Sequence, residues 1–186
     1  NKFANEALQK KSSLVITNKI NKKLPFTKQI KVGDTLKFLT ECASDYRDNI
    51  KPNIIGITGS CGKTTLKELL GNSLKKIAKT YYSPKSYNNK FGVPLSLLNL
   101  RHDNKFGIFE VGMDKKGEIN FLSKILKPNL GIITNISYAH SKNFRNIKGI
   151  AEAKSEIIEN IKTGGIIILN GDDKFYKFLR AKAFKK

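Results

Sequence analysis

Apolar runs alternate with helical segments over most of this sequence, and that alternation limits the folds the chain can adopt. From residue 53 onward, short runs rich in Ile and Val are separated by longer stretches that suit helices. Such alternation is typical of a parallel sheet with helices on both faces, so the predicted fold class is α/β. The predicted strands are 53–58, 79–83, 106–112, 129–136 and 164–171, and the predicted helices are 63–78, 117–126, 147–161 and 173–181.

The N-terminal quarter of the chain has a shorter pattern of the same kind. Asp34 precedes an amphipathic stretch and is a suitable N-cap for it. The expected elements are a helix at 3–11, strands at 13–17 and 28–32, and a helix at 34–50. They resemble the closing half of a small α/β domain, so we expect two domains, residues 1–51 and 52–186, that meet near Pro52.

The segment GITGSCGKTT, residues 56–65, lies between a predicted buried strand and a predicted helix. Glycines in such a turn let backbone amides point at a phosphate, and the helix N-terminus adds partial positive charge. The strict phosphate-loop pattern is not fully met, because Ile57 stands where its first glycine belongs. A glycine-rich turn with a chance lysine is the alternative. The predicted phosphate-binding residues are Gly59, Ser60, Cys61, Gly62, Lys63, Thr64 and Thr65.

Polar clusters follow several of the predicted strands, where ligands of parallel α/β sheets collect. Glu110 ends one strand and could hold Mg²⁺ beside phosphates, although a solvated or capping carboxylate is the alternative. His140 follows another strand by a short loop, where a surface histidine is the more common case. Lys154 lies on the next helix, where it could simply be a solvated charge.

A formal charge of +20 permits binding to nucleic acid, to an anionic membrane surface or to small anionic substrates. The lysines are spread along the whole chain, so a basic, solvated surface is the simplest interpretation. No apolar run approaches the roughly 18 residues that a membrane span needs. Cys42 and Cys61 form no disulfide framework, and the N-terminus has no signal-peptide pattern, which favours the cytoplasm.

Taken in order, the motifs resemble those of one known family. The segments are ITGSCGKTT, YNNKFGVPLSLL, FEVGMDKKGEI, PNLGIITNISYAHSKNF, GIAEAKSEI and LNGDD. Their sequence and spacing, from about Asn53 to Asp173, resemble the Mur ligase family. Within it, EVGMDKKGEI and NNKFGVPLSLL are similar to the members that join D-alanyl-D-alanine to UDP-N-acetylmuramoyl-tripeptide.

The resemblance implies roles for particular residues. Lys63 would contact the ATP phosphates, and Asn88 and Asn89 would lie near the terminal phosphate. Thr64 and Glu110 would hold a first Mg²⁺. His140 would ligate a second Mg²⁺, together with Lys154 if that lysine carries a carbamate.

The resemblance also implies a P-loop central domain and a reaction. ATP would phosphorylate a substrate carboxylate to an acyl phosphate, which the dipeptide amine would attack, releasing ADP and phosphate. We expect a monomer of the bacterial cytoplasm that binds no nucleic acid and inserts in no membrane. Residues 1–51 would be the end of the UDP-substrate domain and 52–186 a truncated ATP-binding domain, with little ligase activity alone. The alternatives are the tripeptide-forming ligases, folylpolyglutamate synthases, another P-loop enzyme such as a kinase, and a nucleic-acid-binding module.

Overall fold

The computed structural model describes residues 3–138 and 143–186. The chain divides into two compact units, Asn1–Cys42 and Ala43–Lys186, and each is described by itself. The domain border expected near Pro52 stays a prediction.

The first unit contains two short parallel strands. Strand β1 (Val15–Thr17) pairs with β2 (Gln29–Lys31), and Ile16 lies opposite Ile30. Its helical elements are α1 (Ala4–Gln9), the 3-10 turn η1 (Phe26–Lys28) and the start of α2 (Thr35–Asn49). The Asp34 carboxylate accepts hydrogen bonds from the amides of Leu36 and Lys37, at 2.7 and 3.0 Å, so the predicted N-cap is confirmed.

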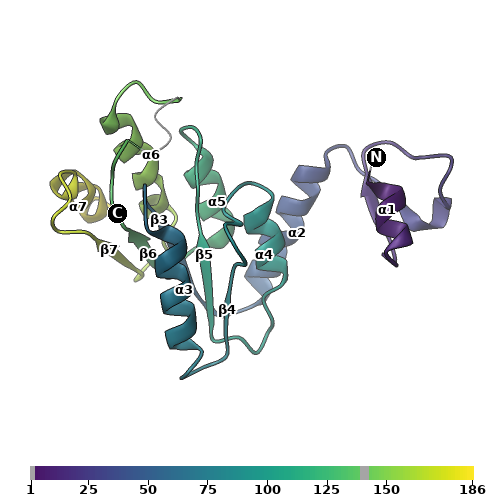
Figure 1. Ribbon diagram of the computed structural model, residues 1–186, viewed down its shortest axis with the longest axis horizontal. Coiled ribbons are helices and arrows are strands. Elements are labelled where there is room, and N and C mark those ends of the chain that lie inside the picture. Colours follow the sequence, from purple (N-terminus) through teal and green to yellow (C-terminus); the bar gives the residue numbers. More distant parts are fainter. Residues whose placement is uncertain (1–2, 139–142) are drawn as a thin grey trace. The chain divides into compact units, whose positions relative to one another are not determined.

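The second unit contains a five-stranded sheet in which every strand pair is parallel (Figure 1). The strands are β3 (Asn53–Thr58), β4 (Thr80–Tyr82), β5 (Phe106–Glu110), β6 (Leu130–Ile133) and β7 (Ile166–Leu169). Their order is β4-β5-β3-β6-β7, so β3 is central. Parallel pairing brings the ends of β3, β5 and β6 to one edge, with Ile57 opposite Glu110 and Thr58 opposite Ile133. The α/β fold class is confirmed.

Helices connect these strands, mostly where the sequence predicts them. They are α3 (Lys63–Leu74), α4 (Gly92–Leu98), α5 (Glu118–Leu126), α6 (Ile147–Glu159) and α7 (Tyr176–Phe184). Helix α3 ends before residue 78 because the amides of Lys76 and Ile77 bond three residues back, which tightens the chain into turns. In the described ranges, no helix is long and apolar enough to cross a membrane.

Helix α4 was not among the helices predicted from the sequence. The segment contains Gly92 and Pro94, two residue types that usually break helices, so its sequence does not predict a helix. Both lie in the first turn, where the amide that proline lacks has no intrahelical partner to bind. The Asn89 side chain accepts hydrogen bonds from the amides of Phe91 and Gly92, at 3.1 and 2.9 Å, and so starts the helix.

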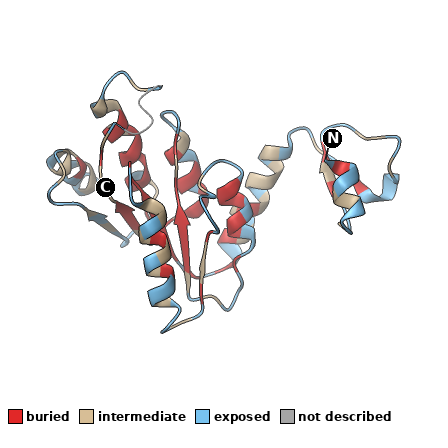
Figure 2. Ribbon diagram, in the orientation of Figure 1, coloured by how far each residue is buried: buried red, intermediate tan, exposed pale blue. Residues whose placement is uncertain are grey.

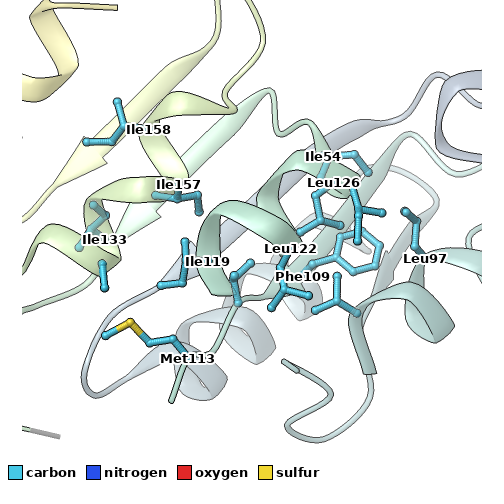
Figure 3. Packing of buried hydrophobic residues seen from close by; sticks show 14 of the residues in the cluster. Ile54, Leu97, Phe109, Met113, Ile119, Leu122, Leu126, Ile133, Ile157 and Ile158 are labelled. Carbon is cyan, nitrogen blue, oxygen red and sulfur yellow. The ribbon is translucent and has the colours of Figure 1, made fainter. Parts of the chain in front are cut away.

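Apolar clusters cover both faces of the sheet. Successive residues of β3 point to opposite faces, so its side chains contribute to both clusters. Ile54 belongs to the larger core cluster, together with Phe109 of β5, Leu122 of α5 and residues of α6 such as Ile157 (Figure 3). Ile57 belongs to a smaller cluster with the apolar side chains of α3. Figure 2 shows the same pattern, with buried residues along α5, α6 and the central strands and exposed residues on the outer side of α3.

Arg47 of α2 is buried in the second unit, with 2% of its surface exposed. Its guanidinium donates to three backbone carbonyls, those of Leu126 at 2.8 Å, Ile50 at 3.0 Å and Lys127 at 3.3 Å. Burial lowers the pKa of Arg47, while the neighbouring Asp48 raises it. One side chain therefore satisfies carbonyls at the ends of two helices, α2 and α5.

Replacing Arg47 with methionine is expected to lower the free energy of unfolding by about 3 kcal/mol, because buried carbonyls would lose charged donors. Urea unfolding of the chain measures the change. Asp48→Asn is the matched control, since its ion pair with Lys127 is partly exposed and such pairs contribute at most about 1 kcal/mol. Equal losses in the two variants would contradict the role given to Arg47.

Candidate functional site

A glycine turn joins the central strand β3 to helix α3 at the carboxyl edge of the sheet. Gly62 directly precedes the helix and has φ of 79°, a left-handed conformation that residues with a Cβ seldom adopt. No side chain caps the first turn of α3 in the described part of the chain. The helix therefore presents backbone amides and partial positive charge at this edge, as an anion site requires.

Gly59, at the start of the turn, lies directly against Thr134, the residue that follows β6. Its φ is 147°, and a Cβ at this position would overlap the Thr134 hydroxyl. That hydroxyl donates to the carbonyl of Cys61 at 2.6 Å, across the turn. Gly59 is therefore required for close contact between two loops.

The segment after β6 also holds the middle of the turn. The Asn135 side-chain oxygen accepts from the amides of Ser60 and Cys61, at 3.1 and 2.9 Å. The Ser60 hydroxyl accepts from the Ser137 amide at 2.8 Å and donates to the Ser137 carbonyl at 3.0 Å. The amides of Ser60 and Cys61 thus already have partners within the chain, and their assignment to phosphate stays a prediction.

Thr134, Asn135 and Ser137 lie in the polar segment TNISYAH, residues 134–140, in which the sequence predicted a role only for His140. Their partners lie about 75 residues away, so no local pattern pairs them. The available signal was position alone, because polar residues directly after a parallel strand reach the edge where neighbouring loops meet. His140 itself lies outside the described residues.

Thr64, Glu110 and Asn88 come together beside the turn. Glu110 is almost fully buried, with 2% of its surface exposed. Its Oε2 accepts from the Thr64 hydroxyl at 2.7 Å, and its Oε1 accepts from the Asn88 side-chain amide at 2.6 Å. The nearby Lys63 ammonium donates to the carbonyl of Gly59 at 2.9 Å, so it lies over the turn.

A hydroxyl and a carboxylate side by side suit Mg²⁺, which uses one or two carboxylates and completes its shell with waters and substrate phosphates. Within residues 3–138 and 143–186, no group of three His, Cys, Asp or Glu side chains forms a larger metal cage. The pair Thr64 and Glu110 therefore fits an ion shared with a phosphorylated ligand.

Asn88 and Asn89 have different surroundings although they are adjacent in sequence. The Asn88 carbonyl accepts from the Gly112 amide at 2.8 Å, which fixes Asn88 beside the end of β5. A Cβ at Gly112 would approach the Asn88 side chain to 2.9 Å, so glycine is needed there. The Asn89 side chain starts α4 instead, and its role at a terminal phosphate stays a prediction.

Lys154 of α6 is buried rather than solvated, with 2% of its surface exposed. The pKa of Lys154 is lowered from the ordinary 10.5 to about 7, chiefly by burial and also by repulsion from Lys63, while Cys61 acts in the opposite direction. These influences show that Lys154 is close to the glycine turn. A buried lysine with this pKa is neutral in a large fraction of molecules near pH 7, so its nitrogen can act as a nucleophile.

Glu156, two residues further along α6, was also missed. Its carboxylate accepts from the amides of Gly117 and Asn120, at 2.8 and 3.0 Å, at the start of α5. It thereby anchors the segment after Glu110 to the helix that carries Lys154. The sequence suggested only one charge among many on a helix surface.

Comparison with known proteins places these features in a family. Residues 57–186 match the model of the Mur ligase middle domain. The UDP-N-acetylmuramoyl-tripeptide--D-alanyl-D-alanine ligase of Buchnera aphidicola is 37% identical over 174 residues, which are 94% of this chain and 38% of that protein. The enzyme of the same name from Rickettsia prowazekii is 38% identical, with 94% and 39% covered.

Solved structures agree with the sequence relatives. A crystal structure of MurF from Acinetobacter baumannii has a TM-score of 0.91 and 33% identity, and the match covers 99% of this chain and 40% of that one. MurF ligase from Thermotoga maritima in complex with ADP has a TM-score of 0.86 and 29% identity, with 99% and 42% covered. The chain thus spans well under half the length of these relatives.

Proposed function

The chain belongs to the Mur ligase family through its middle domain, and from that premise we propose that it supplies the ATP-binding core of a peptidoglycan-precursor ligase. The enzyme would add D-alanyl-D-alanine to UDP-N-acetylmuramoyl-tripeptide. Residues 52–186 would form the ATP-binding central domain, and residues 1–51 would belong to the domain that binds the UDP substrate. The protein would act in the bacterial cytoplasm as a monomer.

One observation carries the proposal: Thr64, Glu110 and Asn88 converge beside an uncapped helix N-terminus that Lys63 overlies. The amides at the start of α3 and the Lys63 ammonium would bind and orient the phosphates of ATP. Thr64 and Glu110 would hold a first Mg²⁺. When bound, that ion neutralises charge on the phosphates as phosphoryl transfer proceeds.

The reaction needs positioning and charge more than a nucleophilic protein side chain. A substrate carboxylate oxygen would bond to the γ-phosphorus as the bond to the ADP oxygen breaks, giving an acyl phosphate. The dipeptide nitrogen would then bond to the acyl carbon and inorganic phosphate would leave. His140 and a carbamate on Lys154 would hold a second Mg²⁺ near these groups, and Asn89 would lie close to the terminal phosphate.

The relatives support this substrate pair, because their names specify UDP-N-acetylmuramoyl-tripeptide and D-alanyl-D-alanine. ADP in the Thermotoga maritima structure supports ATP as the phosphate donor. The excess of lysine would suit two polyanionic substrates.

The full-length protein that carries this chain tests the proposal. We expect sustained ADP release, beyond one equivalent per enzyme, only when UDP-N-acetylmuramoyl-tripeptide and D-alanyl-D-alanine are both present, because the acyl phosphate needs one substrate and its resolution needs the other. Coupled detection of ADP, with each substrate omitted in turn, is the measurement. Sustained release with one substrate or neither would contradict the proposal, and turnover with a single free amino acid would favour a tripeptide-forming relative.

A further inference from the structure

Lys67 is a fully buried lysine that has no place in the site described so far. It lies on α3 one helical turn after Lys63, so the two side chains leave the same face of the helix. None of its surface is exposed. Lysine is rarely buried this completely without partners, because its ammonium loses its water shell.

The Lys67 ammonium has two partners. It donates to the backbone carbonyl of Lys85, and it lies 3.2 Å from a carboxylate oxygen of Glu68. The Glu68 side chain is 42% exposed, so water competes for that ion pair and weakens it. The carbonyl of Lys85 is therefore the main partner of the buried ammonium.

Lys85 lies in the loop of residues 83–91, which joins β4 to α4 and carries Asn88. Its backbone is in the left-handed region, with φ of 48°, which is unusual for a lysine and marks a tightly specified turn. Three residues later, the Asn88 carbonyl is bound by Gly112 and the Asn88 side chain binds Glu110. The loop is thus held at one end by Lys67 and at the other by the strand end that carries Glu110.

We infer that Lys67 is a positioning residue that fixes the loop of residues 83–91 so that Asn88 holds the Glu110 carboxylate in place for Mg²⁺ bound with ATP. This inference rests on the proposed function, in which Glu110 and Thr64 hold that ion. Lys67 acts only through Asn88. Side chains that orient a metal ligand in this way affect metal affinity by about 10- to 100-fold.

The test compares Lys67→Met with Glu68→Gln in the full-length protein. Lys67→Met is expected to raise the Mg²⁺ concentration that gives half-maximal binding of a nonhydrolysable ATP analogue by about tenfold. It should also speed hydrogen exchange at the Gly112 amide, which Asn88 protects. Glu68→Gln should change neither quantity, because it removes the exposed ion pair and leaves the contact with Lys85.

A double-mutant cycle decides whether the effect passes through Asn88. Lys67→Met combined with Asn88→Ala should need no more Mg²⁺ than Asn88→Ala alone, whereas independent residues would give additive effects. Additivity would overturn the inference. So would a Lys67→Met protein that melts at a lower temperature but keeps the wild-type Mg²⁺ requirement and the wild-type exchange at Gly112.

Two further arms keep the result decisive. Should Lys67→Met not fold, Lys67→Gln replaces it, since glutamine is uncharged and too short to keep the same contact, and the same criteria apply. Should the wild-type protein show no Mg²⁺-dependent ATP binding, the proposed function fails. In that case, the rate of hydrogen exchange at the Gly112 amide still tests whether Lys67 holds the loop, because faster exchange in Lys67→Met is expected only if it does.

Discussion

Lys63→Ala is expected to reduce ATP turnover by the full-length protein about a thousandfold while the fold stays intact. The ammonium lies over the glycine turn, where it donates to the carbonyl of Gly59. Alanine cannot supply a cation where charge develops on the transferring phosphoryl group, and losses of this size follow the removal of such donors. ADP release under saturating substrates measures turnover, and circular dichroism with thermal melting measures the fold.

The matched control for this variant is Lys76→Ala. Lys76 is an exposed lysine just after the end of α3, so its removal changes the net charge equally without touching the turn. Turnover within about twofold of wild type is expected for the control, since surface substitutions have small effects. An active Lys63→Ala protein would refute the assignment of GSCGKTT as the phosphate-binding loop.

Lys154→Ala is expected to reduce ligation by about 10²- to 10³-fold, with partial recovery in formate or acetate. In the proposed site, CO₂ adds to the neutral amine, and the product is a carbamate with the release of one proton. A small carboxylate can occupy the space left by alanine and supply similar oxygen atoms. Ligation rates across a series of carboxylate concentrations measure the recovery.

The pH dependence of wild type follows from the pKa of Lys154, which is about 7. Only the neutral amine has a free electron pair for CO₂, so carbamate formation rises as pH increases through 7. Roughly a tenth of the amine is neutral at pH 6 and roughly nine-tenths at pH 8. At an equal concentration of dissolved CO₂, CO₂-depleted enzyme should therefore recover its activity faster at pH 8 than at pH 6.

Lys148→Ala is the control for Lys154, because Lys148 is exposed on the same helix, α6. It should keep wild-type activity and show no response to formate. A fully active Lys154→Ala protein would remove the carbamate from the proposal and leave the site around Glu110 unaffected.

The sequence predicted the sheet and the glycine turn because their signals are local. The run 53–58 has the apolar pattern of a buried strand, and the glycines that follow it match a known turn chemistry. Helix α4 was missed because Gly92 and Pro94 oppose a helix in general, and only their position in its first turn permits one. Local helix propensity does not indicate where in a helix a residue will lie.

The burial of lysines was the least predictable part of the site, although the family resemblance assigned roles to Lys63 and Lys154. Lys67 and Lys154 look like ordinary solvated charges in the sequence, yet both are buried. Burial depends on which loops pack over a helix, and those loops come from distant parts of the chain. The same limit applies to Asn135 and Glu156, whose partners lie tens of residues away.

The contacts that Thr134, Asn135 and Ser137 make with the glycine turn bear on how a ligand would bind. A turn held by neighbouring residues has few alternative conformations. Binding of a triphosphate would therefore cost little conformational entropy in the turn. Binding would then be fast and would involve only small backbone adjustments. Affinity among variants of this turn should accordingly follow the rigidity of the segment after β6 as closely as it follows the number of positive charges.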